Sequence, residues 1–430
     1  MTRRDPIAII GGGFAGTSLL RHLIDHTDHE VVLIDPLERP GAGPAYRTTD
    51  ERHLLNSRAS AMSVDACDPG HFVSWLGARG GYSGDFAPRK WYGEYLCEAL
   101  EQTLDRADER VRVRTASVTD VVPGAEAVRV SLDDGSSVIA SHAVLTLGNS
   151  ASAGPTGPDH DRYVRDPWRS GVLDGLTTPG RVLLIGTGLT AVDVAISLAD
   201  RAETVTAVSG HGLLPLRHSA TVGVPTTKLP PVPTTLRAAV RAVREWTAAP
   251  HDWREVMDVL RHHANDAWAS WSDQDRQSFI EHYARWWEVH RHRMAPRVAD
   301  TIAALRADGR LSVRADRVRA VTENGPALTV DFASGASVDA DTVVNCTGPS
   351  RLPRGANPLV RRLLADGRVR VDSHGLGLDV APCAGAVDAT GRRHERLSVL
   401  GALRRGALWE TTAVPEIRAQ AYDLASRFAT

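Results

Sequence analysis

The feature that most constrains this 430-residue chain is a glycine-rich turn between a short apolar run and a helical pattern. Residues 7–10 form the apolar run, and residues 11–16 follow with the spacing G-x-G-x-x-G. Residues 17–26 predict a helix, and residues 30–34 predict a second strand that ends in Asp35. A strand, glycine turn, helix and second strand with a terminal acid together form a dinucleotide-binding fingerprint, in which the acid accepts hydrogen bonds from ribose hydroxyls.

Each position in this turn has its own physical role. Gly11 permits the tight turn, Gly13 lets the backbone approach a pyrophosphate, and Gly16 lets the helix pack closely on the strand. Phe14 and Ala15 lie within the turn, just before the predicted helix, whose free N–H groups and positive dipole end attract phosphate. We therefore expect these five residues to bind a dinucleotide.

The same unit recurs in the middle of the chain. Residues 181–185 predict a strand, and residues 186–191 follow as G-x-G-x-x-A, with alanine at the third position. Residues 192–199 predict a helix and residues 204–208 the next strand. The candidate binding residues of this turn are Gly186, Gly188, Leu189 and Thr190.

The second unit differs from the first at the ribose position. Ser209 and Gly210 stand where the first unit has an acid, and His211, Arg217 and His218 follow. An acid would repel a 2′-phosphate, whereas hydroxyl, imidazole and guanidinium groups can bind it. The pattern favours NADPH over NADH, with Ser209 and Arg217 as contacts; the alternative is that these basic side chains are merely solvated.

Two further apolar runs end in glycine, at residues 144–148 and 343–348. Each follows a predicted hairpin, with turn signals at residues 133–135 and 334–335. We expect Gly148 and Gly348 to mark places where the backbone passes close to a cofactor.

Composition excludes several other classes of protein. Fifty basic and 52 acidic residues leave a net charge of −2, which gives no reason to expect a nucleic-acid partner. No apolar run is long enough to span a bilayer or to form a secretory signal, so we expect a cytoplasmic protein. The four cysteines show no C-x-x-C spacing, which argues against a zinc ribbon and against dithiol–disulfide exchange. No metal-ligand pattern is present in the sequence, and we predict no metal site.

On its motifs, the chain resembles a bacterial FAD/NAD(P)-binding group of flavoproteins with two dinucleotide-binding domains. The resemblance runs over nearly the whole chain and is carried by residues 11–16, 41–46, 53–56, 62–63, 86–89, 92–96, 186–190, 290–296, 345–348 and 408–418. More remotely, the layout is similar to that of flavin-dependent N-hydroxylases and other NADPH-dependent monooxygenases. One departure stands at Gly210, where relatives tend to have an arginine.

The resemblance implies an α/β fold with two Rossmann-like domains, for FAD and NADPH, and a helical insertion. It places the FAD domain in residues 1–165 and 336–430, interrupted by the NAD(P)H domain in residues 166–335. The insertion at about residues 229–300 carries six of the ten tryptophans, and its aromatic residues form either a packed core or one wall of a substrate pocket. Flavin neighbours would come from the loop after the second strand and from the entry to the C-terminal helix. They are Asn56, Met62, Trp409, Thr411 and Thr412.

The same resemblance implies a function. NADPH would reduce the flavin, and molecular oxygen would then oxidise a small-molecule substrate, with nitrogen as one candidate atom. No acid–base pair or nucleophile triad stands out, which suits an enzyme whose cofactor supplies the reactive chemistry. Two alternatives remain open: an NAD(P)H oxidoreductase or oxidase that transfers no oxygen, and a nucleotide-binding sensor without turnover.

Overall fold

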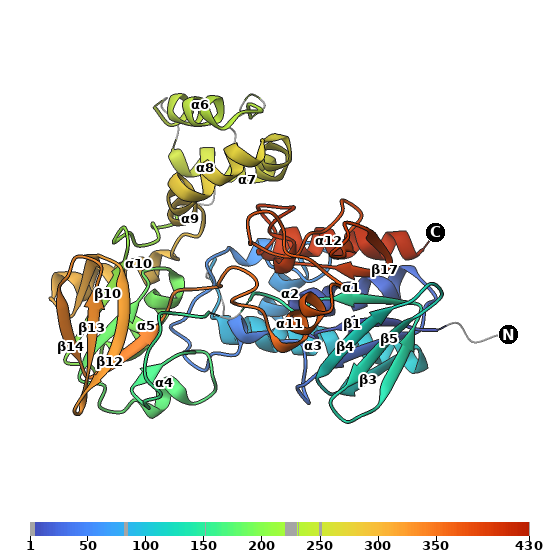
Figure 1. Cartoon of the computed structure of the whole chain (residues 1–430), viewed down its shortest axis with the longest axis horizontal. Coiled ribbons are helices and arrows are strands. Elements are labelled where there is room, and N and C mark those ends of the chain that lie inside the picture. The colour runs from blue at the N-terminus through green and yellow to red at the C-terminus, as the bar shows by residue number, and fades with distance from the viewer. Residues whose placement is uncertain are drawn as a thin grey trace. The chain divides into compact units, whose positions relative to one another are not determined.

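Two mainly parallel sheets organise the chain, which divides into two compact units in the computed structural model (Figure 1). The first unit comprises residues 1–47, 57–150 and 351–430, and the second comprises residues 48–56 and 151–350. The structure describes residues 5–80, 85–150, 152–219, 230, 232–248 and 252–429. Residues 220–229, 231 and 249–251, which belong to or border the predicted insertion, lie outside the described residues.

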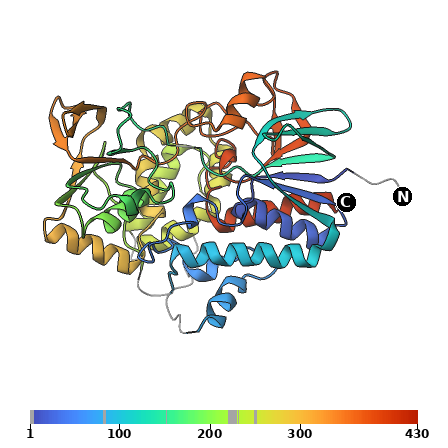
Figure 2. The same cartoon turned by 90° about the horizontal axis from the view of Figure 1, so that it is seen from below.

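The first unit is built on a six-stranded sheet. Its strand order is β16 (Gly385–Val387), β17 (Arg393–Val399), β7 (His142–Leu145), β1 (Ile7–Ile10), β2 (Val31–Asp35) and β3 (Val111–Thr115). All neighbours pair in parallel except β16 with β17. Helices α1 (Phe14–His26), α3 (Arg89–Ala107) and α12 (Val414–Phe428) cover one face, as Figure 2 shows in blue, cyan and red.

The alternation of side chains along the strands explains this layering. Ile9 of β1 meets α1, while Ala8 and Ile10 join the core on the other face. That core is closed by a three-stranded antiparallel sheet and one helix. They are β4 (Val118–Pro123), β5 (Val128–Leu132), β6 (Ser137–Ala140) and α11 (Pro358–Ala365).

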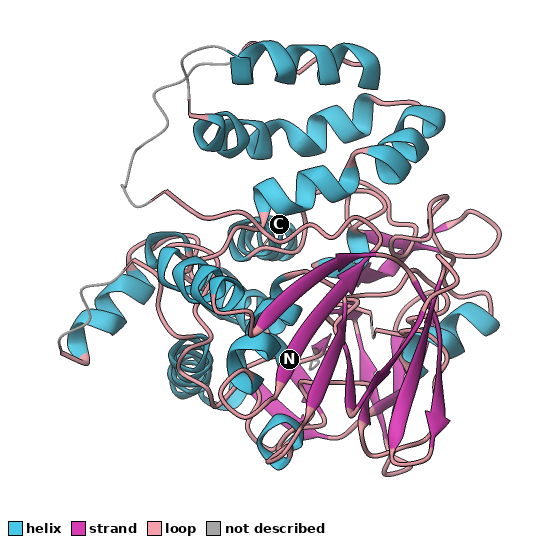
Figure 3. Ribbon diagram, turned by 90° about the vertical axis from the view of Figure 1, so that its left-hand side faces the viewer, coloured by secondary structure: helices cyan, strands magenta, loops and turns pink. Residues whose placement is uncertain are grey.

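The second unit repeats the plan. Its parallel sheet has the order β11 (Leu311–Ala315), β10 (Thr204–Ser209), β9 (Arg181–Ile185), β15 (Thr342–Asn345) and β8 (Tyr163–Val164). Helices α5 (Leu189–Leu198) and α10 (Pro296–Ala307) pack together beside it, and the antiparallel strands β12 (Val318–Asn324), β13 (Ala327–Phe332) and β14 (Ser337–Ala340) close the opposite core. Figure 3 shows this layering of strands and helices. The predicted α/β fold is confirmed.

The bounds of the two units differ in places from the domain limits expected from the sequence. Strand β15 pairs in parallel with β9, as β7 pairs with β1, so it lies in the second unit although residues 336–430 were expected in the first. Residues 48–56 also group with the second unit.

The described part of the insertion forms four helices before α10. They are α6 (Leu236–Ala248), α7 (Trp253–Ser270), α8 (Asp273–His282) and α9 (Ala284–Arg291), stacked in Figure 1. Trp268 is buried, and Trp246, Trp253 and Trp287 pack on an apolar cluster of α7, whereas Trp286 is 49% exposed. Most of these aromatic side chains therefore build the core of the insertion.

The remaining helices are short: α2 (His71–Ala78) and α4 (Val172–Gly175), together with the 3-10 turns Pro44–Tyr46, Ala59–Ala61, Asp108–Arg110 and Ala402–Arg404. Among the described residues, no helix is both long and apolar enough to cross a membrane.

Buried histidines, among them His22 and His142, are expected to make the first unit sensitive to acid, because burial lowers the pKa of each to about 4. His22 on α1 is fully buried against Tyr422 of α12, at 5.4 Å between ring centroids. Burial lowers the pKa of His22 to about 4 despite the carboxylate of Asp65 nearby. In the unfolded chain the same group titrates near 6.5, so the folded state loses stability as the pH falls from about 6.5 toward 4.

We predict that His22→Gln weakens this acid sensitivity. The loss attributable to one such histidine is at most about 1.4 kcal/mol per pH unit. Urea unfolding at about pH 7 and about pH 5 should show a smaller drop in unfolding free energy for the variant than for the parent. His262→Gln, an exposed histidine on α7 of the second unit, is the matched control and should follow the parent. Equal drops for parent and His22→Gln would contradict the assignment.

Candidate nucleotide-binding sites

The turn after β1 needs glycine at two positions for steric reasons. Gly11 has φ 109°, and a Cβ there would lie 2.7 Å from the carbonyl oxygen of Thr146. A Cβ at Gly16 would lie 2.0 Å from the carbonyl oxygen of Gly11. These glycines thus let α1 and β7 approach the turn closely, as the sequence predicted.

Gly13 differs because its backbone is extended, with φ −72° and ψ −167°, which any residue adopts. A Cβ at Gly13 would be 3.7 Å from the nearest atom, Cα of Gly43. Gly41 holds this second glycine loop in place, since its N–H donates to the carbonyl of Gly12 at 2.7 Å. A cradle without side chains therefore stands between Gly13 and Gly43.

Helix α1 begins at this cradle. Its N-cap is Gly13, which provides no side-chain cap, so the N–H groups of Phe14 and Ala15 in the first turn are available for an anion. The donors and the open space fit a pyrophosphate.

Asp35 ends β2 next to the turn. Its Oδ2 accepts the Gly12 N–H at 2.6 Å, and its Oδ1 accepts the Leu37 N–H at 2.9 Å. The backbone thereby fixes the carboxylate, which retains lone pairs for ribose hydroxyls. The same contact orders the glycine turn, a role that the sequence did not reveal.

The C-terminal segment reaches the start of α1. Gly401, at the end of β17, has φ 83°, and a Cβ there would lie 3.7 Å from Cβ of Ala15. The buried Thr411 hydroxyl donates to the Gly401 carbonyl at 3.0 Å and accepts from Gln420 Nε2 at 2.8 Å. Because this hydroxyl is already satisfied, Thr411 is left with its backbone to offer a cofactor.

The other flavin candidates of the first unit are distributed as follows. Met62 is buried, and Trp409 is buried with Arg405 over its ring at 4.7 Å. Thr412 is half-buried just before α12, whose N-cap has no side-chain hydrogen bond. Gly148 has φ 72° and nothing near its Cβ position.

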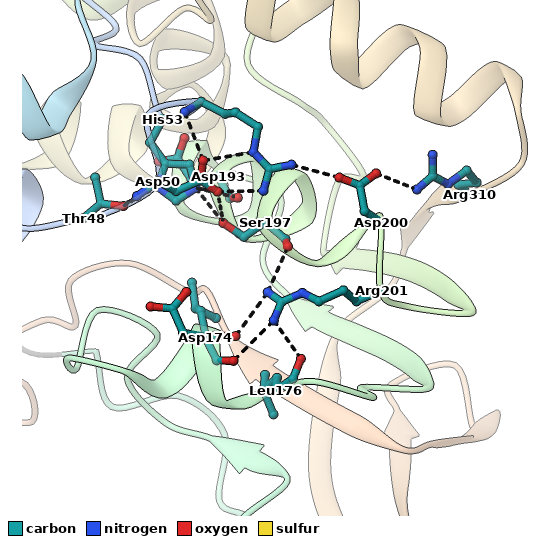
Figure 4. Close-up of polar contacts among 12 residues, drawn as sticks. Thr48, Asp50, His53, Asp174, Leu176, Asp193, Ser197, Asp200, Arg201 and Arg310 are labelled. Carbon is teal, nitrogen blue, oxygen red and sulfur yellow. Dashed lines mark hydrogen bonds and ion pairs between the residues drawn. The ribbon is translucent and has the colours of Figure 1, made fainter.

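Asn56 lies in the second unit, with the segment of residues 48–56 that polar contacts fix to α5 (Figure 4). Buried His53 bonds Thr48 Oγ1 through Nδ1 at 2.7 Å and Ser197 Oγ through Nε2 at 2.9 Å. The Ser197 hydroxyl donates to Asp50 at 2.8 Å. Burial disfavours ionised Asp50, but hydrogen bonds, chiefly from Arg52, offset it and hold the Asp50 pKa well below its ordinary value.

The backbone of Asn56 is also engaged, because its carbonyl lies 3.0 Å from Nε2 of His218. The predicted flavin neighbours Asn56 and Met62 are thus six positions apart in sequence yet belong to different units. The glycine- and proline-rich composition of this loop gave no sign that it changes units.

The turn after β9 reproduces the geometry of the first. Gly186 has φ 123°, and a Cβ there would lie 2.3 Å from the Cys346 carbonyl oxygen. Gly188 is extended, at φ −78° and ψ −172°, with nothing within 4 Å of its Cβ position. Leu189 and Thr190 begin α5 and are half-buried. This turn also fits a pyrophosphate.

Hydroxyl and guanidinium groups gather where the ribose is expected in the second unit. Ser209 Oγ lies 2.8 Å from Thr187 Oγ1 and accepts the Gly212 N–H at 3.1 Å. Arg285 of α9 donates to Thr187 Oγ1 at 3.0 Å and to the Leu213 carbonyl at 2.8 Å. No local sequence pattern marks Arg285, because only folding brings the insertion to this turn.

Two other predicted contacts of the second unit have distinct settings. Arg217 forms an ion pair with Asp300 of α10, so its charge is already compensated. Gly348 has φ 75° and open space at its Cβ position, after a turn in which Asn345 accepts from Thr347 Oγ1 at 2.8 Å.

Comparison with known proteins agrees with the first site. Residues 8–150 match a family model described as FAD-NAD(P)-binding. No curated protein sequence matches the chain significantly.

Solved structures resemble the whole chain in fold. The ornithine N-hydroxylase of Kutzneria sp. 744 has a TM-score of 0.67 at 16% identity, with 99% of both chains covered. A cadaverine monooxygenase from Erwinia amylovora, bound to FAD, has a TM-score of 0.65 at 16% identity, covering 99% of this chain and 94% of that one. The bacillithiol disulfide reductase of Bacillus cereus has a TM-score of 0.57 at 14% identity, with 99% of both covered.

The turn, the cradle and the helix start after β1 all lie within residues 8–150, the part that the family model matches. Residues 8–150 are thus an FAD/NAD(P)-binding domain, and the chain as a whole has the fold of the two-domain flavoprotein oxidoreductases that bind FAD and NADP.

Proposed function

We propose that this protein is an FAD-dependent monooxygenase that uses NADPH and molecular oxygen to oxidise a small molecule, with nitrogen as the candidate atom. The observation that carries the proposal is that one chain has two glycine turns with open space at the start of a helix, at Gly13 and at Gly188. Two nucleotides are what an enzyme needs when hydride passes from a nicotinamide to a flavin. The N-hydroxylase and cadaverine monooxygenase likenesses, which cover almost the entire chain, favour oxygen as the electron acceptor.

The residues of this chain would bind and orient the two nucleotides and the substrate, while FAD would supply the redox chemistry. Bound FAD would accept hydride from the nicotinamide and deliver electrons to oxygen. Gly13, with the first N–H groups of α1, would hold its pyrophosphate, and Asp35 its ribose. The uncapped start of α12 would use its N–H groups to stabilise negative charge on the pyrimidine edge of the reduced flavin.

The thiol chemistry of the chain does not favour disulfide reduction. All four cysteines are free: Cys67 is exposed, Cys97 and Cys346 are buried, and Cys383 is partly exposed. Burial raises the pKa of Cys346, which keeps this thiol protonated and unreactive. Burial also opposes ionisation of Cys383, but hydrogen bonds from the Gly385 backbone and from Arg393 outweigh it and lower the Cys383 pKa. Because Cys383 is a free cysteine without a disulfide partner, this thiol does not by itself supply a dithiol. The disulfide reductase with the same fold nonetheless makes an oxidoreductase without oxygen transfer the second candidate.

We predict that Gly13→Val removes FAD and leaves the protein folded. The backbone there accepts any residue, and the new side chain would fill the cradle instead of clashing with protein. The purified variant should be colourless and should keep the circular dichroism of the parent.

Gly188→Val is the matched variant in the second turn, where the space is also open. It should remain yellow and lose NADPH-driven flavin reduction. A Gly13→Val protein with full FAD content would contradict the assignment of the first site.

Oxygen transfer is tested by screening amines and amino acids for stimulated NADPH consumption. For a true substrate, we expect oxygen uptake to match formation of a product that has gained one oxygen atom, with little hydrogen peroxide. If oxygen is always recovered as peroxide, the oxidoreductase or oxidase replaces the monooxygenase. No NADPH consumption by the FAD-loaded protein would instead indicate a nucleotide-binding sensor.

A further inference from the structure

The internal repeat allows the two ribose positions to be compared residue by residue. Asp35 ends β2 and Ser209 ends β10. In the first unit the Ala116 N–H donates to the Asp35 carbonyl at 3.1 Å, and in the second the Asp316 N–H donates to the Ser209 carbonyl at 2.9 Å. The neighbouring strand therefore leaves the sheet at the same point in both units.

Ser117, the second residue after the end of β3, is likewise equivalent to Arg317, the second residue after the end of β11. The carbonyl of Ser117 accepts the Asp133 N–H at 2.9 Å, and the carbonyl of Arg317 accepts the Ala333 N–H at 2.8 Å. At these two equivalent positions, the first unit has Asp35 and Ser117. The second unit has Ser209 and Arg317 instead.

The side chain of Arg317 lies directly over Gly210. A Cβ at Gly210 would be 3.0 Å from Nε of Arg317 and 3.4 Å from its Cγ. Because Gly210 has no side chain, the Arg317 guanidinium can lie against the backbone one residue beyond Ser209. Arg317 is exposed, and within the described ranges its guanidinium takes part in none of the ion pairs.

The Asp316 carboxylate, next to Arg317 in sequence, accepts the Arg317 backbone N–H at 2.8 Å and is also engaged by other groups. Asp316 accepts from Ser334 Oγ at 2.6 Å and pairs with Arg314 at 2.9 Å. Its charge is thereby compensated. At the other side of Ser209, the Arg285 guanidinium reaches Thr187 and also pairs with Glu288 at 3.4 Å. The Arg317 guanidinium and the hydroxyl groups of Ser209 and Thr187 together suit a dianionic phosphate.

We propose that Arg317 is the residue that selects a 2′-phosphorylated nicotinamide nucleotide in the second unit. It would pair with the 2′-phosphate beside the Ser209 hydroxyl. In the first unit, the Asp35 carboxylate suits the free 2′-hydroxyl of FAD and would repel a phosphate. The inference rests on the proposed function, which assigns the second turn to the nicotinamide nucleotide.

The test is calorimetric binding of NADP+ and NAD+ to the FAD-loaded protein, with 2′,5′-ADP and 5′-AMP as probes that lack the nicotinamide. We expect Arg317→Ala to lose about 10- to 100-fold in affinity for NADP+ and 2′,5′-ADP, the worth of one charge-assisted hydrogen bond. Affinity for NAD+ and 5′-AMP should not change.

Two further variants sharpen the result. Arg319→Ala removes an exposed arginine two residues further on and should bind as the parent does. Gly210→Arg combined with Arg317→Ala moves the guanidinium across the contact and should regain preference for NADP+, because residue 210 does not need a positive φ.

Several outcomes would overturn the inference. They are unchanged NADP+ affinity in Arg317→Ala, an equal loss for NAD+, or loss of NADP+ affinity in Arg217→Ala alone. A parent that binds NADP+ and NAD+ equally also overturns it, while turnover with either nucleotide would leave the proposed function standing. A parent that binds neither contradicts the proposed function and the inference with it.

Discussion

The packing of a helix against the turn that precedes it is the constraint on which the rest of the structure depends. In the first unit this is the contact of Gly16 with the Gly11 carbonyl, where a Cβ would lie only 2.0 Å from oxygen. The contact sets the start of α1 over the end of β1, and its uncapped N–H groups point to the same place as the Gly13–Gly43 cradle. Every later feature of the site is positioned relative to that junction.

The second unit keeps this constraint and changes what surrounds it. Gly186 and Gly188 repeat the backbone conformations of Gly11 and Gly13 to within a few degrees of φ at the second position. The difference lies at the ends of β2 and β10, where Asp35 is replaced by Ser209. One backbone design can therefore serve two nucleotides, with the choice made by a few side chains at the ribose end.

Local patterns in the sequence predicted the two nucleotide-binding units, while the family resemblance implied how they are arranged into domains. Each glycine turn lies between a buried strand and a helix within a few residues, so spacing alone predicted both units and the hairpins before Gly148 and Gly348. What the sequence could not supply depends on contacts between distant segments. Arg285 on α9 and Arg317 in the link between β11 and β12 reach the second turn from about 100 residues further along the chain. The passage of residues 48–56 into the second unit depends on buried His53 meeting Ser197, a pair that no local pattern marks.

If the two glycine turns bind FAD and a nicotinamide nucleotide that exchange hydride, anaerobic titration of the purified, flavin-loaded protein with NADPH will show it. We expect one FAD per chain, whose absorbance is bleached by one equivalent of NADPH and returns when oxygen is admitted. A protein that carries no FAD after reconstitution, or whose bound FAD is reduced by dithionite and by neither NADPH nor NADH, would contradict it.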